Sequence, residues 1–231
     1  AVEWIKRMLG RFKGAEAIQA YGLTETSPIL TLLPMSDHLR AVETGNDKLL
    51  GSVGRQLSAV DLRIVDDKGQ NLACGEAGEI VVRGPNVTKG YIKRPAATQE
   101  SFKNGWFYTG DIGRLDEDGY LFLLDRKKDM IITGGEIVFS AEVEAVLYQY
   151  TEVDECAVIG VPDETYGEAV LAVVVPAPGQ ALEAEELIAH CRGKIGGYKI
   201  PRRYVFVDQL PKSAVDKVLK TKLRQTYEGK E

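Results

Sequence analysis

The sequence predicts an α+β protein built from more than one domain. Its length of 231 residues suggests roughly one to two domains. Residues 48–126 carry short, evenly spaced strand patterns between glycine-rich turns, whereas the chain beyond them alternates helix and strand patterns. We therefore divide the chain into three segments, residues 1–47, 48–127 and 128–231.

The first two segments differ in their local patterns. Residues 2–9 have helical spacing without a visible cap, so we expect the chain to begin within a helix; a short strand at 17–21 and a loop at 22–28 follow. In the second segment, apolar residues alternate with polar ones over Asp61–Val65 and Gly78–Gly84, with a turn between them. This spacing is typical of a small β-barrel or sandwich.

The third segment predicts a compact α+β domain. Ser140 is a good N-cap for a helix whose apolar residues recur at helical spacing as far as Tyr150. The almost wholly apolar run Ala169–Val175 predicts a central strand. Further elements are predicted as a strand at 156–161, a helix at 184–191, a strand at 204–207 and a closing helix at 218–227.

Composition and charge exclude several functional classes. The chain has 44% hydrophobic and 27% charged residues and a net charge of −5, so it lacks the basic field expected for nucleic-acid binding. No segment is apolar over the roughly 18 residues needed for a membrane span, and no signal-peptide pattern is present. The scattered cysteines Cys74, Cys156 and Cys191 suggest reduced, buried thiols in a cytoplasmic protein. With only two histidines, we expect lysine, arginine, carboxylate and hydroxyl groups to do any chemistry.

The most informative local feature is a carboxylate and a guanidinium on one predicted strand pair. The apolar runs Tyr120–Leu124 and Met130–Ile132 are separated by a polar break, with Asp111 and Arg126 on opposite flanks of the strand pair. A carboxylate accepts two hydroxyl hydrogens and a guanidinium donates in a fixed fork, which suits a cis-diol such as a ribose. A hairpin with ordinary turn charges explains the same residues equally simply.

Four short motifs, in order, carry a resemblance that composition could not supply. They are Tyr21-Gly22-Leu23-Thr24-Glu25, Tyr108-Thr109-Gly110-Asp111, Asp125-Arg126-Lys127-Lys128-Asp129 with Gly134-Gly135-Glu136, and Leu210-Pro211-Lys212-Ser213-Ala214-Val215-Asp216-Lys217. They resemble the fifth, seventh, eighth and tenth core motifs of the adenylate-forming superfamily of acyl-CoA synthetases, peptide-synthetase adenylation domains and firefly luciferases. The match spans essentially the whole chain.

The resemblance implies a fold, a reaction and its substrates. Residues 1–47 would be the end of a large α/β nucleotide-binding subdomain, 48–127 a β-barrel-like subdomain and 128–231 a C-terminal α+β lid domain. The reaction would convert a carboxylic acid and ATP into an acyl-adenylate with Mg²⁺, then transfer the acyl group to coenzyme A with release of AMP. The run Thr26-Ser27-Pro28-Ile29-Leu30 suggests a fatty or otherwise hydrophobic acid. Association into a homo-oligomer is left open.

The resemblance also assigns roles to residues of the nucleotide site. It implies that Tyr21 stacks on the adenine and Gly22 contacts the nucleotide, that Thr24 donates to a phosphoryl oxygen and that Glu25 ligates Mg²⁺. Asp111 and Arg126 would hold the ribose. The same Thr-Glu pair also suits an ordinary helix N-terminus, with the threonine as its cap.

In the lid domain, the resemblance makes Lys217 the catalytic lysine that bridges the substrate carboxylate and the α-phosphate. A solvated basic face formed by Lys212, Lys217, Lys220 and Lys222 is the plain alternative. Lys128 would be the hinge about which the domain rotates.

The loop Gly134-Gly135-Glu136 would then approach the nucleotide and CoA. A tight β-turn explains the two glycines equally well.

The chain departs from the family pattern in ways that raise two alternative functions. The residue before the catalytic lysine is usually glycine and is Asp216 here, while Ile137, Phe139 and Ser140 replace Asn, Tyr and Pro. The glycine-rich phosphate loop of the family does not occur before Tyr21, so we expect a fragment that is inactive in adenylation by itself. A non-catalytic module that binds nucleotide, CoA or protein, and an adenylation domain that loads a carrier protein, remain alternatives.

Overall fold

Two compact units make up the computed structural model, residues 1–127 (the first unit) and 128–231 (the second unit). The structure describes residues 2–11, 15–214 and 216–228. The described helices in both units are too short or too polar to cross a membrane.

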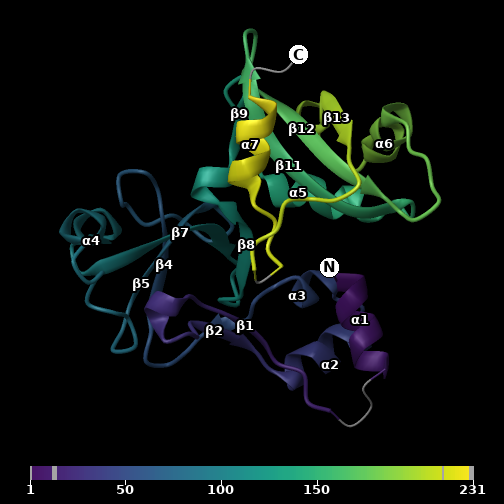
Figure 1. Cartoon of the computed structure of the whole chain (residues 1–231). Helices are drawn as coiled ribbons and strands as arrows, with labels where there is room; N and C mark the ends of the chain where they lie inside the picture. The colour runs from purple at the N-terminus through teal and green to yellow at the C-terminus, as the bar shows by residue number, and fades with distance from the viewer. Residues whose placement is uncertain (1, 12–14, 215, 229–231) are drawn as a thin grey trace. The chain divides into compact units, whose positions relative to one another are not determined.

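The first unit contains two antiparallel sheets and several short helices (Figure 1). Its elements are α1 (Val2–Arg11), β1 (Gln19–Tyr21), η1 (Thr24–Thr26), β2 (Thr31–Leu33), α2 (Met35–Thr44), α3 (Asp47–Leu50), β3 (Arg55–Gln56), β4 (Asp61–Val65), β5 (Gly78–Arg83), α4 (Pro95–Ser101), β6 (Phe102–Lys103), β7 (Trp106–Leu115) and β8 (Leu121–Arg126). Strands β1, β2 and β3 form the small sheet. The helix at the start of the chain and the two strands predicted after residue 60 are confirmed.

Strand β7 organises the larger sheet, which curves as a half-barrel. It pairs with β5 along one edge, while β6 and β8 pair with opposite ends of its other edge. The register shifts by one residue at Ile112/Gly113 against β8 and by two residues between Glu79 and Val81 against β5. Such bulges bend a strand and redirect its side chains.

The buried residues of the first unit explain why these short strands persist. One core cluster includes Leu30, Leu62, Ile80 and Phe107 and spans both sheets. Burial of an aliphatic or aromatic side chain stabilises the fold by about 1.5–3 kcal/mol, whereas one backbone hydrogen bond contributes about 0.5–1.5 kcal/mol net.

The second unit is one five-stranded sheet with helices on both faces. Its elements are β9 (Ile131–Thr133), β10 (Glu136–Val138), α5 (Ser140–Leu147), β11 (Val153–Asp163), β12 (Gly167–Pro176), α6 (Ala184–Cys191), η3 (Gly197–Lys199), β13 (Arg203–Phe206) and α7 (Lys220–Tyr227). The prediction that Ala169–Val175 forms a central strand is confirmed, because β12 pairs with β11, β13 and β9.

Alternate residues of β12 enter different cores. Ala172 and Val174 belong to the cluster that contains residues of α5 and α6, while Leu171 and Val173 belong to the cluster that contains Leu223 of α7. Successive side chains of a strand point to opposite faces, so a sheet covered on both faces requires a continuous apolar run.

Some sequence-based details are wrong. The N-cap of α5 is Phe139, and Ser140 is the first helical residue, where its hydroxyl accepts a hydrogen bond from Lys220. Helix α5 ends before Tyr150. Cys74 is exposed, whereas the other two cysteines are buried as expected.

Candidate functional site

Asp111 and Arg126 are direct cross-strand neighbours of β7 and β8. The Nε atom of Arg126 lies 3.5 Å from Oδ1 of Asp111. The carboxylate is only 13% exposed, whereas the guanidinium is 55% exposed, so the pair places a held carboxylate beside a solvent-facing cation. The carboxylate and guanidinium singled out in the sequence are thus brought together.

Tyr21 joins this pair from a strand 90 residues away in sequence. Its hydroxyl donates a hydrogen bond of 2.8 Å to Oδ2 of Asp111. Burial, followed by the charge of Asp111, raises the pKa of Tyr21, so the phenol stays protonated and acts as a donor. We call Tyr21, Asp111 and Arg126 the carboxylate cluster.

The chain turns sharply just after Tyr21, and Gly22 makes this turn feasible. A Cβ atom on Gly22 would lie 1.8 Å from the carbonyl oxygen of Pro28. The amide of Leu30 donates to the carbonyl of Tyr21 at 2.7 Å and closes the loop. This close approach of two backbone segments excludes any side chain at Gly22.

Strand β7 holds Asp111 through its own neighbours. The Thr109 hydroxyl accepts a hydrogen bond from the Asp111 amide at 3.1 Å and donates to the carbonyl of Ile80 at 2.8 Å. Gly110 adopts a φ of 73°, a left-handed conformation that favours glycine, and its amide donates to Oε1 of Glu79. These contacts fix the local backbone that carries the carboxylate.

Thr24 and Glu25 lie in the single turn η1. Thr24 is exposed, and Glu25 is half-buried and accepts a hydrogen bond of 2.9 Å from the Tyr91 hydroxyl. Partial burial and this contact with Glu25 raise the pKa of Tyr91. The idea that Thr24 caps a helix is wrong, because Leu23 is the N-cap and Thr26 makes the local hydrogen bonds of the turn.

The donor set fits magnesium only together with a ligand. Groups of three or more His, Cys, Asp or Glu that could hold a metal ion do not occur within the described residues. Mg²⁺ is commonly bound by one or two carboxylates plus substrate phosphates and water, and Glu25 offers one such carboxylate.

The Gly134-Gly135 pair is the two-residue turn of the β9–β10 hairpin. Both glycines have positive φ angles, 59° and 84°, and the Gly134 amide donates to the carbonyl of Tyr166 at 2.8 Å. Positive φ at both central positions is what a type I′ hairpin turn requires. Glu136 follows the turn and is exposed, so the β-turn interpretation of this motif is confirmed.

Lys217 lies on an exposed hairpin of the second unit. The Ser213 amide donates to the carbonyl of Lys217 at 2.8 Å, and Lys212 pairs with Val218 as an isolated bridge. Asp216, just before Lys217, has a φ of 58°. The backbone therefore adopts, at this position, the conformation for which glycine is the favoured residue.

The lysines around Lys217 do not share one solvated face. Lys220 is 17% exposed and binds Glu144 at 2.7 Å and the Ser140 hydroxyl at 2.6 Å. Lys212 contacts Glu155 at 2.7 Å and Asp216 at 3.3 Å. The basic-face alternative is wrong for Lys220, which links α7 to α5.

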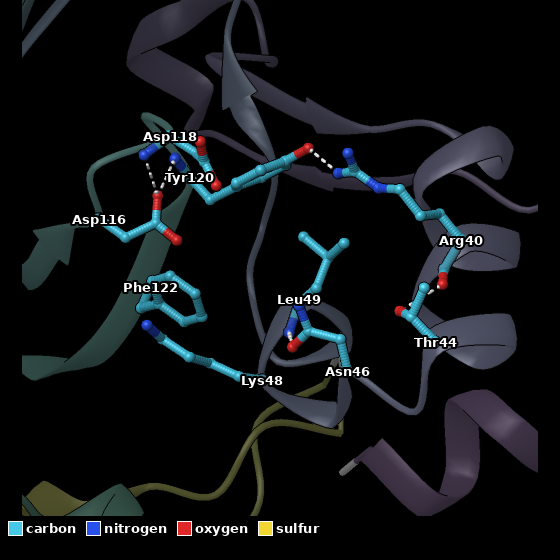
Figure 2. Close-up of a pocket in the computed structure, with 9 residues that line it drawn as sticks. All are labelled: Arg40, Thr44, Asn46, Lys48, Leu49, Asp116, Asp118, Tyr120 and Phe122. Atoms are coloured by element: carbon cyan, nitrogen blue, oxygen red, sulfur yellow. Dashed lines mark hydrogen bonds between the residues drawn. The ribbon is translucent and has the colours of Figure 1, made fainter.

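A cavity of about 350 Å³ also occurs in the first unit, and its lining includes none of the predicted site residues (Figure 2). Its walls combine the rings of Tyr120 and Phe122 with Arg40 and Lys48. The Tyr120 hydroxyl accepts a hydrogen bond from Arg40 at 2.6 Å and donates to Asp37 at 2.9 Å.

Comparison with known proteins places the chain in a family. Residues 1–92 match the model of the AMP-binding enzyme, and residues 142–217 match the model of the AMP-binding enzyme C-terminal domain. Together the two matched segments cover more than half of the chain. The chain belongs to the AMP-binding, adenylate-forming enzymes.

Individual members of the AMP-binding enzymes agree with this assignment. Feruloyl-CoA synthase from an Amycolatopsis species is 44% identical over 93% of the chain and 42% of its own length. Long-chain-fatty-acid–CoA ligase from Salmonella typhimurium is 40% identical over 100% of the chain and 38% of its own length. The chain thus spans about two fifths of the length of the curated relatives it matches.

A solved structure gives the same result for the fold. The o-succinylbenzoate CoA synthetase of Bacillus subtilis, in complex with its acyl-adenylate intermediate, superposes with a TM-score of 0.85 at 38% identity. The alignment covers 96% of this chain and 43% of that one. The α+β fold of the AMP-binding enzymes, with its half-barrel sheet, is therefore confirmed for this chain.

Two residues of the site were missed in the sequence. Tyr91 reaches Glu25 across 66 residues, and Glu79 reaches Gly110 across 31. Neither residue lies in a motif, and both contacts come from sheet and loop packing. The sequence signal for Glu79 was its place in the Gly78-Glu79 pair at the start of a predicted strand.

Proposed function

We propose that this chain is part of an ATP-dependent carboxylate–CoA ligase. The carboxylate cluster is the observation that carries the proposal. It holds an acceptor, Asp111, and a donor, Arg126, in fixed positions in a chain that belongs to the AMP-binding enzymes. In this proposal the ribose hydroxyls of ATP donate to Asp111, and Arg126 donates to a ribose oxygen. Tyr21 holds the carboxylate in place.

Residues of η1 serve the phosphates. Thr24 donates its exposed hydroxyl to a phosphoryl oxygen. Glu25, which Tyr91 orients at 2.9 Å, contributes the protein carboxylate to Mg²⁺. The metal supplies charge neutralisation at the phosphates when it is bound.

Lys217 acts in the first half-reaction. A carboxylate oxygen of the acid attacks the α-phosphorus, a new P–O bond forms, and the bond to pyrophosphate breaks. The ammonium of Lys217 neutralises the negative charge that builds on these oxygens. Its exposed position on a hairpin supports this role, because a lysine on a flexible stem can reach a ligand.

The second half-reaction transfers the acyl group to a thiol. The CoA sulfur attacks the acyl carbon, loses its proton, and the bond to the AMP oxygen breaks. Rotation about Lys128 would exchange Lys217 for the Gly134-Gly135-Glu136 hairpin at the reacting centre. The two glycines present a slim backbone that a pantetheine arm can pass closely.

The acid is proposed to be hydrophobic, with a long aliphatic or an aromatic part. The names of the matched relatives support this class, since they include feruloyl-CoA synthase and long-chain-fatty-acid–CoA ligase. A panel of ferulate, 2-succinylbenzoate, acetate and dodecanoate tests it. Preference for acetate by more than tenfold in kcat/KM would exclude the hydrophobic class.

A non-catalytic nucleotide-binding module is the second candidate, and Asp216 favours it. A carboxylate next to Lys217 would repel an approaching phosphate. Such a module would bind AMP through the carboxylate cluster without forming an adenylate.

The half-reactions separate the two candidates. In the longer protein that the ligase proposal implies, Lys217→Ala should lower the rate of ATP–pyrophosphate exchange by about 10²–10³, as expected for loss of one transition-state donor. Thioester formation from preformed acyl-adenylate should be largely preserved. Lys222→Ala on the neighbouring helix α7 is the matched control. A loss below threefold in the exchange reaction would remove Lys217 from this role.

A further inference from the structure

Three charged residues form the turn at which the two units divide. Lys127, Lys128 and Asp129 make the one-turn helix η2 (Lys127–Asp129), and the first unit ends after Lys127. Short 3₁₀ turns of this kind are common connectors between other elements. The outer two residues of η2 have ionic partners, each within its own unit.

Lys127 is anchored in the first unit. Its ammonium lies 2.9 Å from Oε2 of Glu79 and 3.0 Å from Oδ1 of Asp67. Burial by itself lowers the pKa of Lys127, but hydrogen bonds to these carboxylates outweigh it and raise the pKa above its usual value. Glu79 is only 10% exposed and Lys127 is 43% exposed, so this contact is screened less than a fully exposed ion pair.

Asp129 is anchored in the second unit. Its Oδ1 accepts a hydrogen bond of 2.9 Å from Arg224 of α7, and both side chains are largely buried, at 12% and 21% exposure. Loss of one partner from such a buried pair leaves an uncompensated charge, which costs several kcal/mol. Asp129 is therefore strongly held to α7.

Lys128 lies between these anchors and differs from both. It is exposed, and within the part of the chain that the structure describes its side chain makes no ion pair or hydrogen bond. The backbone of Lys128 is consequently the first place where φ and ψ can change without breaking an ionic contact.

The anchor in the first unit continues to the carboxylate cluster. The second oxygen of Glu79, Oε1, accepts a hydrogen bond of 3.2 Å from the amide of Gly110. Gly110 is the left-handed residue directly before Asp111. Glu79 thus connects the end of the first unit to the strand segment that carries Asp111.

From these contacts we propose that Lys127 and Asp129 are positioning residues that confine rotation between the units to Lys128. This inference rests on the proposed function, in which one chain completes two half-reactions by domain rotation. The Lys127–Glu79 pair keeps the Asp111 segment undisturbed while the second unit turns. The Asp129–Arg224 pair makes Asp129 turn together with α7 and the rest of that unit.

Backbone dynamics of the 231-residue chain test the proposal without any ligand. Rigid backbone has an order parameter of about 0.85 by NMR relaxation and flexible backbone one below about 0.6. We expect Lys128 to have the lowest order parameter of residues 125–130. Lys127→Met should extend the loss of order to residues 126 and 127, whereas Arg224→Met should extend it to residues 129 and 130.

Matched and rescuing variants separate positioning from general destabilisation. Lys68→Met, in an exposed turn of the first unit, and Lys222→Met, on the exposed side of α7, should leave residues 125–130 unchanged. Lys127→Met alone leaves the Glu79 carboxylate buried without its cation, which should weaken the hydrogen-exchange protection of the β7 amides. The double variant Lys127→Met with Glu79→Gln removes that charge, so it should recover the protection of β7 but not the order of residue 127.

Two outcomes would overturn the inference. One is that both single variants loosen the same residues; the other is that Lys127→Met leaves residues 126 and 127 as ordered as before. In the longer protein, Lys127→Met should change the ratio of adenylation to thioesterification rates by at least about threefold, since only the second step requires completed rotation. Absence of ligase activity would contradict the proposed function, while the relaxation result would still decide the one-residue hinge.

Discussion

At the scale of single residues, conformation explains positions that chemistry alone leaves ambiguous. Asp216 was recognised in the sequence as a substitution at a glycine position, and its φ of 58° supplies the physical reason why glycine is favoured there. The sequence could reveal the anomaly but not the backbone angle, because the turn depends on pairing between Lys212 and Val218.

A pair of variants at Asp216 tests this explanation. Asp216→Gly should exceed Asp216→Ala in stability by about 1 kcal/mol, because alanine keeps the Cβ that disfavours a left-handed backbone. Hydrogen exchange of the amides of Ser213 and Leu219, which close the hairpin, measures the difference. Equal protection in the two variants would contradict a left-handed residue at this position.

The cysteines offer a second test at the residue scale. Burial, followed by the nearby charge of Glu144, raises the pKa of Cys156, and burial raises that of Cys191, whereas Cys74 is exposed. A thiol-specific reagent at pH 8 should therefore modify Cys74 rapidly and the other two only on unfolding. Mass spectrometry of the modified chain counts the labelled sites, with the Cys74→Ser variant as the control. Rapid labelling of that variant would refute the burial assignment.

At the scale of elements, apolar pattern predicted strands well and helix ends less well. Strand β12 was predictable because its run of apolar side chains can be satisfied only between two covered faces. The start of α5 was not, since the Ser140 hydroxyl is drawn away from the cap position by Lys220, 80 residues further along the chain. Local capping preferences give way to such a buried contact.

The contacts of Lys220 with Ser140 and Glu144, which we call the Lys220 network, predict how α7 is held against α5. Glu144 accepts from the Lys220 ammonium at 2.7 Å and from the Val158 amide at 2.8 Å, and both charged side chains are largely buried. Glu144→Ala should lower the free energy of opening of the second unit by about 3 kcal/mol, since it leaves a buried ammonium unpaired. The slowest-exchanging amides of β12 report this change. Glu152→Ala, at a partly exposed position, should alter it by less than about 0.5 kcal/mol, and an equal effect of both variants would disprove the role of the network.

A further element-scale prediction concerns the loop after β1. Gly22→Ala forces a Cβ onto the Pro28 carbonyl, so the loop must open and Tyr21 must shift from Asp111. We expect a loss of stability of about 1–3 kcal/mol together with weaker AMP binding. Gly10→Ala, where a Cβ meets no atom within 4 Å, is the matched control. Wild-type stability and AMP affinity in Gly22→Ala would contradict the close approach.

At the scale of the whole molecule, the order of the motifs predicted more than any single motif. Asp111 and Arg126 could be paired in advance because a strand pair brings them to neighbouring positions, whereas Tyr21 joined them only through packing of the two sheets of the first unit. The partner of Glu25 could not be predicted for the same reason, since Tyr91 lies in an irregular segment. Long-range side-chain contacts depend on how sheets pack, and no local pattern records that packing.

The central claim is that a ribose is held by Asp111 and Arg126, and NMR titration of the 231-residue chain with AMP tests it most directly. AMP should shift the backbone amides of residues 109–113 and 124–127. The Kd that the titration gives for 2′,3′-dideoxy-AMP, which lacks both hydroxyls, should be at least about tenfold higher than that for AMP, a difference of about 1.4 kcal/mol in binding free energy. Asp111→Asn should remove the preference for AMP, because an amide cannot replace a carboxylate that accepts from two hydroxyls. Equal Kd values for the two nucleotides, or shifts confined to residues outside these strands, would contradict the account.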